Sequence, residues 1–252
     1  MLPRLIRAEA SKLRGTPTSW WVFGAAFAVV AVSTGLSLVL GPVRTAEDQR
    51  SLVGFASVGG LVLLLLGVVA AAGEYRHRTI VPAILITPRR TTLVAAQAIV
   101  YAAAGAAVGL TSAALCMLIT VVGVTLRGAH FVVPVEHIAL VALGAVIYTA
   151  LSAALGVGLG AVARNQVAAV AGVLVFLSLI DPAISALAPA LGRFGPSALG
   201  IAFSDTGATN NGPFSQILPL WAAAVVYLAY TALFMVAGTS TSVRREIPTN
   251  TN

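Results

Sequence analysis

Six apolar runs, each long enough to cross a bilayer, constrain the fold of this chain more than any other feature. All are free of Asp, Glu, Lys and Arg except the fifth in chain order, which contains one aspartate. A helix of about 20 residues crosses a hydrocarbon core about 30 Å thick. The runs therefore predict an all-α polytopic membrane protein with six transmembrane helices. The predicted spans are Trp20–Leu40, Gly54–Ala72, Thr92–Val124, His137–Ala163, Gln166–Ser185 and Ile217–Thr239.

The third run is longer than one membrane crossing requires. Leu93–Leu126 contains no charged residue in 34 positions, and a helix of that length would extend about 51 Å. We therefore expect this helix to tilt or to continue beyond the membrane. The chain as a whole is 58% hydrophobic and 9% charged, with a mean hydropathy of +0.96, which excludes a soluble domain with a polar surface.

The 15 Lys and Arg residues predict the orientation, because cytoplasmic loops retain the excess of these residues. Eleven lie in the N-terminal segment, the loops after spans two and four, and the C-terminal tail, whereas four lie on the opposite side. Both termini are therefore expected in the cytoplasm. Fourteen of the 15 are arginine, a composition typical of GC-rich bacteria, so the predicted location is the bacterial cell membrane. The net charge of +7 follows from this topology, and we expect no nucleic-acid partner.

The N-terminal residues 1–19 predict a cytoplasmic amphipathic helix on the membrane surface, because their apolar and basic residues fall toward different sides of a helix. Trp20 and Trp21 follow as interface anchors. Residues 20–239 then form the transmembrane domain, and residues 240–252 form a cytoplasmic tail.

Two connecting segments differ from ordinary loops. The first cytoplasmic loop, about 73–91, contains "GEYRHRTI", which concentrates charge in a chain that otherwise avoids it. The extracytoplasmic segment, about 186–216, belongs to an apolar stretch with four prolines between Pro182 and Pro213. Backbone at membrane depth must be covered by protein or face a water-filled cavity. This stretch therefore predicts re-entrant or interfacial helices between spans five and six.

Asp181 is the one acid inside a predicted span. The 14 apolar residues before it, Val167–Ile180, make only about 21 Å of helix. Pro182 disfavours helical geometry in the preceding residue, so the helix either breaks here or continues past the proline. Two interpretations stay open: Asp181 reaches water at a helix end in the outer leaflet, or it is a polar group on a substrate or ion path.

The sequence lacks the motifs for catalysis and for nucleotide binding. It contains no G-x-x-x-x-G-K-[ST], no H-E-x-x-H, no C-x-x-C and no G-x-S-x-G. We therefore expect no enzymatic activity, no cofactor and no metal site in this chain. Cys116 lies inside the third span and is expected to be a small buried apolar residue. His130 and His137 are expected to be polar residues of the membrane interface.

The combined pattern resembles the permease subunit of bacterial ABC-2-type transporters over essentially the whole chain. The resemblance is carried by "AEASKLRGT" before the first span, "GEYRHRTI" after the second and "TPRRTTLV" before the third. One position departs from the family pattern, because Gln97 stands near the place where members often carry a basic residue. The matching residues are Glu9, Lys12, Leu13, Arg14, Glu74, Tyr75, Arg76, Thr79, Ile80, Pro88, Arg89 and Arg90.

The resemblance implies that the first cytoplasmic loop docks on a separate ATPase subunit, present in two copies, which would carry ATP and Mg. It also implies a second permease copy or paralogue, with membrane lipids around the pair. The residues expected in the ATPase-coupling loop are Glu74, Tyr75, Arg76, His77, Arg78, Thr79 and Ile80. Those expected in the interface helix are Arg7, Glu9, Lys12 and Arg14.

The function expected from this resemblance is ATP-driven transport, in the direction of export, of a drug, lipid or peptide-like substrate. Candidate residues of a translocation path are the polar groups within the spans, although hydroxyls there also bond to their own helix backbone. Two alternatives stay open: an ion-coupled secondary carrier that uses Asp181, and a non-transporting membrane subunit or sensor. The candidate path residues are Asp181, Thr111, Ser112 and Ser178.

Overall fold

The computed structural model describes residues 2–76, 90–163, 165–204 and 217–243. Within these ranges the regular structure is entirely helical, and six segments are long and apolar enough to cross a membrane. This result confirms the predicted all-α membrane fold with six transmembrane helices. The six segments are Pro17–Leu40, Ala46–Gly73, Thr91–Leu126, Val135–Ala163, Gln166–Leu187 and Leu220–Thr239.

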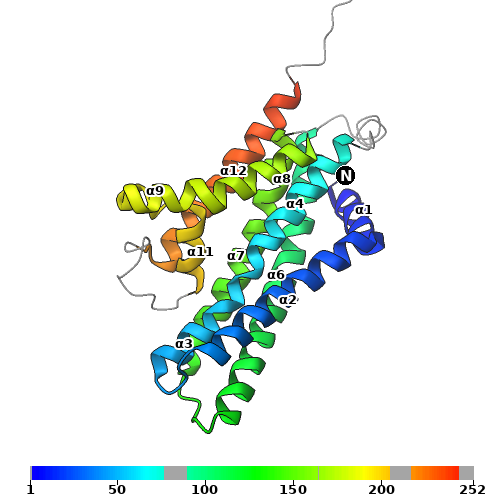
Figure 1. Cartoon of the computed structure of the whole chain (residues 1–252). Coiled ribbons are helices and arrows are strands. Elements are labelled where there is room, and N and C mark those ends of the chain that lie inside the picture. The colour runs from blue at the N-terminus through cyan, green and yellow to red at the C-terminus, as the bar shows by residue number, and fades with distance from the viewer. Residues whose placement is uncertain (1, 77–89, 164, 205–216, 244–252) are drawn as a thin grey trace, which may run out of the picture.

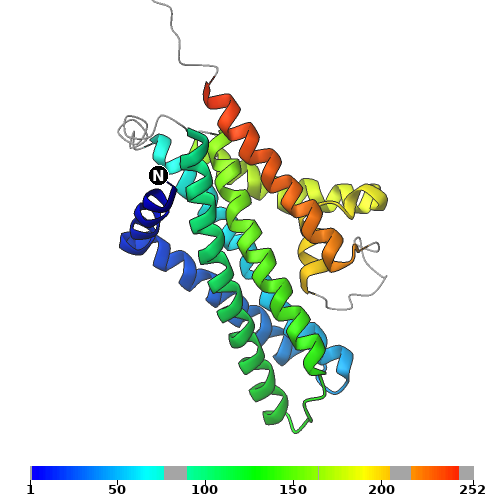
Figure 2. The same cartoon turned by 180° about the vertical axis from the view of Figure 1, so that it is seen from behind.

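The helices form a bundle with α1 at one end and α3 at the other (Figure 1). Seen from behind, α6 and α7 run side by side along the whole length (Figure 2). The elements are α1 (Leu2–Gly15), α2 (Pro17–Leu40), α3 (Ala46–Gly54), η1 (Phe55–Ser57), α4 (Gly59–Arg76), α6 (Arg90–Leu126), α7 (Val135–Ala163), α8 (Gln166–Val175), η2 (Phe176–Ile180), α9 (Asp181–Leu187), α10 (Pro189–Gly192), α11 (Pro196–Ser204) and α12 (Leu220–Val243).

Helix α6 is a single α-helix of 37 residues, which confirms the unusual length expected of the third span. It reaches farther from α1 than the neighbouring α2 does (Figure 1). Just after its last residue, Arg127 donates to the carbonyl oxygens of Leu38 (2.6 Å) and Gly41 (2.8 Å). These carbonyls belong to the last turn of α2 and the residue that follows it, where helical partners are lacking. Arg127 therefore caps α2 and ties it to α6.

The centre of the bundle is built by close approach of α4, α6 and α7. A Cβ atom on Gly156 of α7 would collide with the carbonyl oxygen of Leu64 in α4. A Cβ atom on Gly105 of α6 would lie 2.5 Å from the carbonyl oxygen of Thr149 in α7. Glycine permits this contact between backbones, which is how small residues bring transmembrane helices together. The Thr149 hydroxyl shares its hydrogen between the Gly105 carbonyl oxygen of α6 (2.8 Å) and the Ala145 carbonyl oxygen of its own helix (2.7 Å).

The second span begins earlier than predicted and is not a regular helix. It starts with α3, whose capping box joins Thr45 and Asp48 through both side chains and both backbone N–H groups. A short 3₁₀ turn, η1, then separates α3 from α4. The acidic first turn of α3, with Glu47 and Asp48, is too polar to count as part of an apolar run. This is why hydropathy alone places the start of the span at Gly54.

The fifth span continues through Pro182 instead of breaking before it. Asp181 keeps helical dihedral angles, φ −63° and ψ −46°. The irregularity lies one turn earlier, in the π-helical segment η2, where the Asp181 N–H bonds to the Phe176 carbonyl oxygen. A proline ring clashes with the carbonyl of the residue four positions before it, and a wider turn relieves that clash. Of the two alternatives left open by the sequence, the structure shows the helix that continues past the proline, with a π-helical turn before it.

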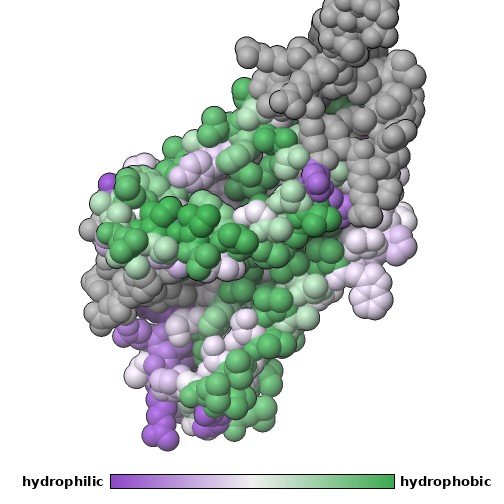
Figure 3. Space-filling view, turned by 45° about the horizontal axis from the view of Figure 1, so that its top comes forward, coloured by the Kyte–Doolittle hydropathy of each residue, from purple (hydrophilic) through white to green (hydrophobic). Residues whose placement is uncertain are grey.

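The fifth span is also mostly surface. Hydrophobic residues dominate the face of the molecule over α8 and α9, whereas hydrophilic residues gather at the end where α3 lies (Figure 3). Leu174, Val175 and Leu179 are all exposed. In a bilayer such a surface contacts lipid chains at no desolvation cost, so it fits a lipid-facing element at the periphery of the bundle.

Candidate functional site

Helix α1 is the one predicted functional element whose side chains the structure describes in full from Pro3 onward. It packs against α6 and α2 through its apolar side, where Leu13 is buried. Arg7 and Arg14 are exposed, as the interface-helix prediction requires. The Trp20 indole N–H donates to the Arg14 carbonyl oxygen at 3.1 Å and so fixes the turn between α1 and α2.

Glu9 departs from the simple amphipathic pattern, because its side chain is only 4% exposed. Lys12 Nζ donates to Glu9 Oε1 at 2.5 Å, an i to i+3 pair within α1. A buried carboxylate needs such a partner, since its desolvation is otherwise costly. Glu9 and Lys12, two of the four residues that the sequence assigned to the interface helix, therefore form one unit, with the carboxylate turned inward and the ammonium group turned outward.

The predicted coupling loop is described only in part. The backbone of Glu74, Tyr75 and Arg76 completes α4. The remaining residues of that prediction, His77, Arg78, Thr79 and Ile80, lie outside the described residues. Two helices flank this loop: α4 ends before it and α6 begins after it. The end of α4 and the start of α6 both lie at the end of the bundle that carries α1 (Figure 1).

The residues proposed for a translocation path do not come together at one place. Thr111 is exposed on α6, and its hydroxyl donates to the carbonyl oxygens of Ala107 and Val108 in the same helix. Ser112 is fully buried in α6, with no hydrogen-bond partner for its hydroxyl among the described residues. Ser178 is exposed in η2. The proposed path residues thus occupy separate environments on α6 and on the fifth span.

Asp181 does not reach water, which corrects the first of the two interpretations offered for it. Its side chain is 1% exposed. Its carboxylate accepts a hydrogen bond of 2.8 Å from the backbone N–H of Ser197, in the first turn of α11. A carboxylate at this position accepts a hydrogen bond from an N–H that has no partner within the helix. Its negative charge also interacts favourably with the positive N-terminal end of the helix dipole. Asp181 therefore joins the end of the fifth span to α11.

Aromatic packing holds α11 against the bundle. The rings of Tyr148 from α7 and Phe203 from α11 stack with centroids 5.4 Å apart. Tyr227 from α12 meets the Tyr148 ring edge-on at 5.5 Å. The Tyr227 hydroxyl also lies 3.0 Å from the hydroxyl of Ser152, one turn along α7. Three helices distant in sequence are thus fixed around one buried aromatic cluster, worth about 0.5–1.5 kcal/mol per ring pair beyond burial.

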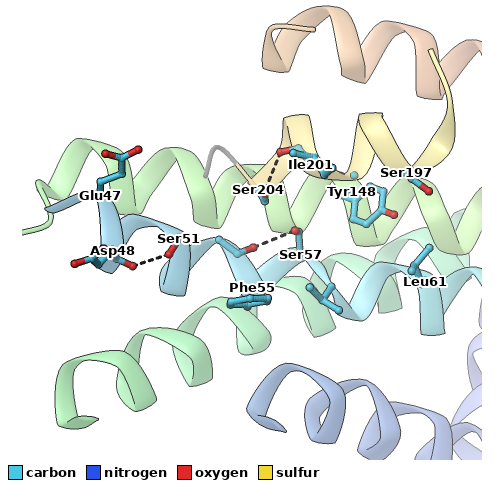
Figure 4. Close-up of a pocket in the computed structure, with 13 residues that line it drawn as sticks. Glu47, Asp48, Ser51, Phe55, Ser57, Leu61, Tyr148, Ser197, Ile201 and Ser204 are labelled. Carbon is cyan, nitrogen blue, oxygen red and sulfur yellow. Dashed lines mark hydrogen bonds between the residues drawn. The ribbon is translucent and has the colours of Figure 1, made fainter. Parts of the chain in front are cut away.

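A cavity of about 620 Å³ lies between α11 and the bent segment formed by α3, η1 and α4. Tyr148 of α7 forms part of its wall (Figure 4). Pockets for drug-sized ligands fall in the range of about 300–1,000 Å³. The lining residues are Glu47, Asp48, Ser51, Gly54, Phe55, Ser57, Val58, Leu61, Tyr148, Ser197, Gly200, Ile201 and Ser204.

This cavity has an acidic end and a mainly apolar end. Glu47 and Asp48 lie at the acidic end, which α3 forms, and Phe55 lies between the two ends (Figure 4). Leu61 of α4 lies at the apolar end, with Tyr148 and Ser197 near it (Figure 4). The arrangement suits a ligand that carries a polar group on an apolar body.

Sequence reasoning missed this cavity because its walls come from three separate parts of the chain. Each part carries only an ordinary signal. Glu47 and Asp48 form an acidic first turn of a helix, and the serines of α11 lie in an apolar segment between the fifth and sixth spans. Pro196 at the start of α11 signals a helix N-terminus. No spacing in the sequence indicates that α11 would face α3.

No model of a known protein family matches this chain, and no curated protein matches it. Its function is therefore inferred from the arrangement of its own residues, with the ABC-2 resemblance as a hypothesis to test.

Proposed function

We propose that this chain is the membrane-spanning permease subunit of an ATP-driven exporter of the ABC-2 type. A separate ATPase would dock on the cytoplasmic loop between α4 and α6 and would carry ATP and Mg, with two copies serving a pair of permeases. The observation that carries the proposal is the placement of α1. This basic amphipathic helix folds back onto α6 and α2 at the end of the bundle where α4 ends and α6 begins.

The charges at this end fit a protein interface on the cytoplasmic side. Arg7 and Arg14 are exposed on α1, and the loop sequence "GEYRHRTI" adds an acid, two arginines and a tyrosine. Such groups can form charge-assisted hydrogen bonds with a partner, while an aromatic residue provides an apolar anchor. The basic excess at this end also favours the cytoplasmic side of a bacterial cell membrane.

The ion-coupled alternative has less support. It requires Asp181 to face a path for ions, whereas this carboxylate is 1% exposed and bound to the Ser197 N–H. Intramembrane acids in carriers face a water-filled cavity or pair with other polar groups along the path. Here the partner is the N-terminus of α11, a contact that supports a structural role for Asp181.

The test is to remove the loop charges and follow docking of the ATPase encoded beside this protein. The triple variant Glu74→Ala, Arg76→Ala, Arg78→Ala should lose copurification with the ATPase or uncouple ATP hydrolysis from transport. A matched control is Arg44→Ala, Arg50→Ala, Glu136→Ala, which removes the same charges from the opposite end of the bundle. Removal of one partner from a buried charge pair at an interface costs about 2–5 kcal/mol of binding free energy, whereas removal of an exposed charge at the rim costs little.

Wild-type assembly and coupling in the loop variant would contradict the docking role.

The purified chain alone should neither bind nor hydrolyse ATP. ATP hydrolysis by a preparation free of ATPase subunits would contradict the assignment as a permease without its own energy source. A preparation that shows no transport with any ATPase would favour the membrane subunit or sensor.

A further inference from the structure

We infer that the cavity between α3 and α11 binds an amphipathic organic cation, with its charged nitrogen toward Glu47 and Asp48 and its apolar body toward Leu61. The role of this cavity as a substrate site rests on the proposed transport function, and the inference names the class of molecule transported. The inference is carried by the chemistry of the cavity wall.

Three of the hydroxyl groups that line the wall donate their hydrogen to backbone carbonyl oxygens. Ser51 donates its hydrogen to the Asp48 carbonyl oxygen at 2.7 Å, and Ser57 donates to the Gly54 carbonyl oxygen at 3.2 Å. Ser204 donates to the Ile201 carbonyl oxygen at 2.7 Å. A hydroxyl has one hydrogen and two lone pairs, so the Ser51 and Ser57 hydroxyls can offer only their oxygens to a ligand. These two groups favour a ligand with N–H or O–H donors.

The formal charge of the wall is negative. Glu47 and Asp48 line the cavity, and no Lys, Arg or His is among the described residues that line it. Arg44 and Arg50 lie just before α3 and within it, but neither belongs to the lining. The Asp48 carboxylate is held in place by the Thr45 backbone N–H at 2.9 Å. One carboxylate is thus fixed by the capping box, and the exposed Glu47 stands one residue before it.

The wall also contains apolar side chains, one of them an aromatic ring. Phe55, Val58, Leu61 and Ile201 supply hydrophobic surface. The face of an aromatic ring also attracts a cation, which adds to the preference set by the carboxylates. An anion would meet two carboxylates, and a purely polar cation would leave the apolar end unfilled. An amphipathic cation satisfies both ends.

The aromatic cluster fixes the geometry of the cavity. Tyr148 touches the cavity and stacks on Phe203, so α11 is held at a set distance from α4. A Cβ atom on Gly60 of α4 would collide with the Tyr148 ring. A Cβ atom on Gly200 of α11 would lie 3.0 Å from the Tyr148 hydroxyl. Glycine on both sides lets the tyrosine form the back of the cavity without filling it.

The test uses the full chain, purified without an ATPase in nanodiscs of uncharged phosphatidylcholine. Ethidium, a fluorescent aromatic cation with amino groups, is titrated and followed by anisotropy. We expect saturable binding, with no comparable binding of the anionic probe anilinonaphthalene sulfonate. The double variant Glu47→Gln, Asp48→Asn should weaken ethidium binding about tenfold or more, because it removes both carboxylates.

A second variant tests the apolar end without changing charge. Leu61→Trp should block the cavity and weaken ethidium binding about tenfold, since a larger side chain occupies the ligand volume. The control Leu118→Trp adds the same bulk at an exposed position of α6 outside the cavity. Glu136→Gln is the charge control, because Glu136 is exposed and does not line the cavity. Thermal melting of each variant checks that the fold is kept.

Absence of saturable ethidium binding, or unchanged binding in both cavity variants, would overturn the inference. Equal binding of the anionic probe would overturn it as well. Binding can be measured without any ATPase, so its failure is distinct from failure of the proposed function. Saturable binding combined with no ATP-driven export would retain the site and reject the transporter. Export of other molecules without cation binding would retain the transporter and reject this substrate class.

Discussion

The second and fifth spans have similar hydropathy but opposite surroundings. Mean hydropathy reaches 2.6 in the second span and 2.3 in the fifth, yet 67% of the most apolar stretch is buried in the former and 11% in the latter. Gly156 meets the backbone of α4 from the second span, whereas Gly172 in the fifth span has open space around it. Hydropathy therefore identifies a membrane-spanning helix but does not tell which helix forms the centre.

The two regions are also held in different ways. The α4, α6 and α7 centre depends on backbone contact over many turns, which dispersion forces stabilise collectively. The fifth span depends on fewer contacts, among them the Asp181 carboxylate with the Ser197 N–H of α11, whereas α11 itself packs into the bundle through Leu199 and Phe203. A region held by few contacts is less stable locally. The helix that Asp181 contacts, α11, forms one wall of the cavity.

The strongest test of this contrast compares valine at two glycines. Gly156→Val should destabilise the protein by about 3 kcal/mol or more or prevent folding, because the new side chain meets backbone atoms that cannot move aside. Gly172→Val should change stability by less than about 1 kcal/mol, since nothing lies near that position. Size-exclusion profiles and melting temperatures in detergent measure both. Equal behaviour of the two variants would contradict the division into centre and periphery.

Removal of the Asp181 carboxylate should have the next largest effect. Asp181→Ala leaves the Ser197 N–H without its partner and should cost about 1–3 kcal/mol. Asp181→Asn keeps an acceptor oxygen and should cost less. Ser178→Ala, at an exposed position of the same span, is the matched control. Melting temperatures rank the variants, and an Asp181→Ala protein as stable as its control would show that the contact does not hold α11.

The hydroxyl pair within the aromatic cluster should contribute a smaller amount. Tyr227→Phe or Ser152→Ala removes one partner of the buried 3.0 Å hydrogen bond and should cost about 1 kcal/mol. A double-mutant cycle should give a coupling energy of about 1 kcal/mol, because each variant removes the same bond. Additive effects would mean that the two hydroxyls contribute independently of each other.

The smallest effect is expected at Thr111. Its side chain is exposed and bonds only to its own helix, so Thr111→Ala should change stability by less than about 0.5 kcal/mol. Thr149→Ala, by comparison, removes a bond between α6 and α7 and should cost about 1 kcal/mol. Chemical denaturation in detergent resolves this difference. A larger loss at Thr111 than at Thr149 would contradict the burial of the α6–α7 contact.

The sequence alone determined the number of spans, the length of α6 and the short helices before α12. These features follow from composition over about 20 residues, and a bilayer imposes that length directly. The amphipathic character of α1 was also predicted from its pattern, because the alternation of apolar and basic residues is local. Cys116 was expected to be a buried small residue, and it is fully buried.

Only the tertiary structure decided the role of Asp181, the partners of the glycines and the existence of the cavity. The pairs Asp181–Ser197, Gly156–Leu64 and Tyr148–Phe203 join residues from different helices. Local patterns such as proline after aspartate or glycine at four-residue spacing occur in both packed and exposed helices. Which neighbour each residue meets depends on how the helices cross, and that is fixed by packing over the whole bundle.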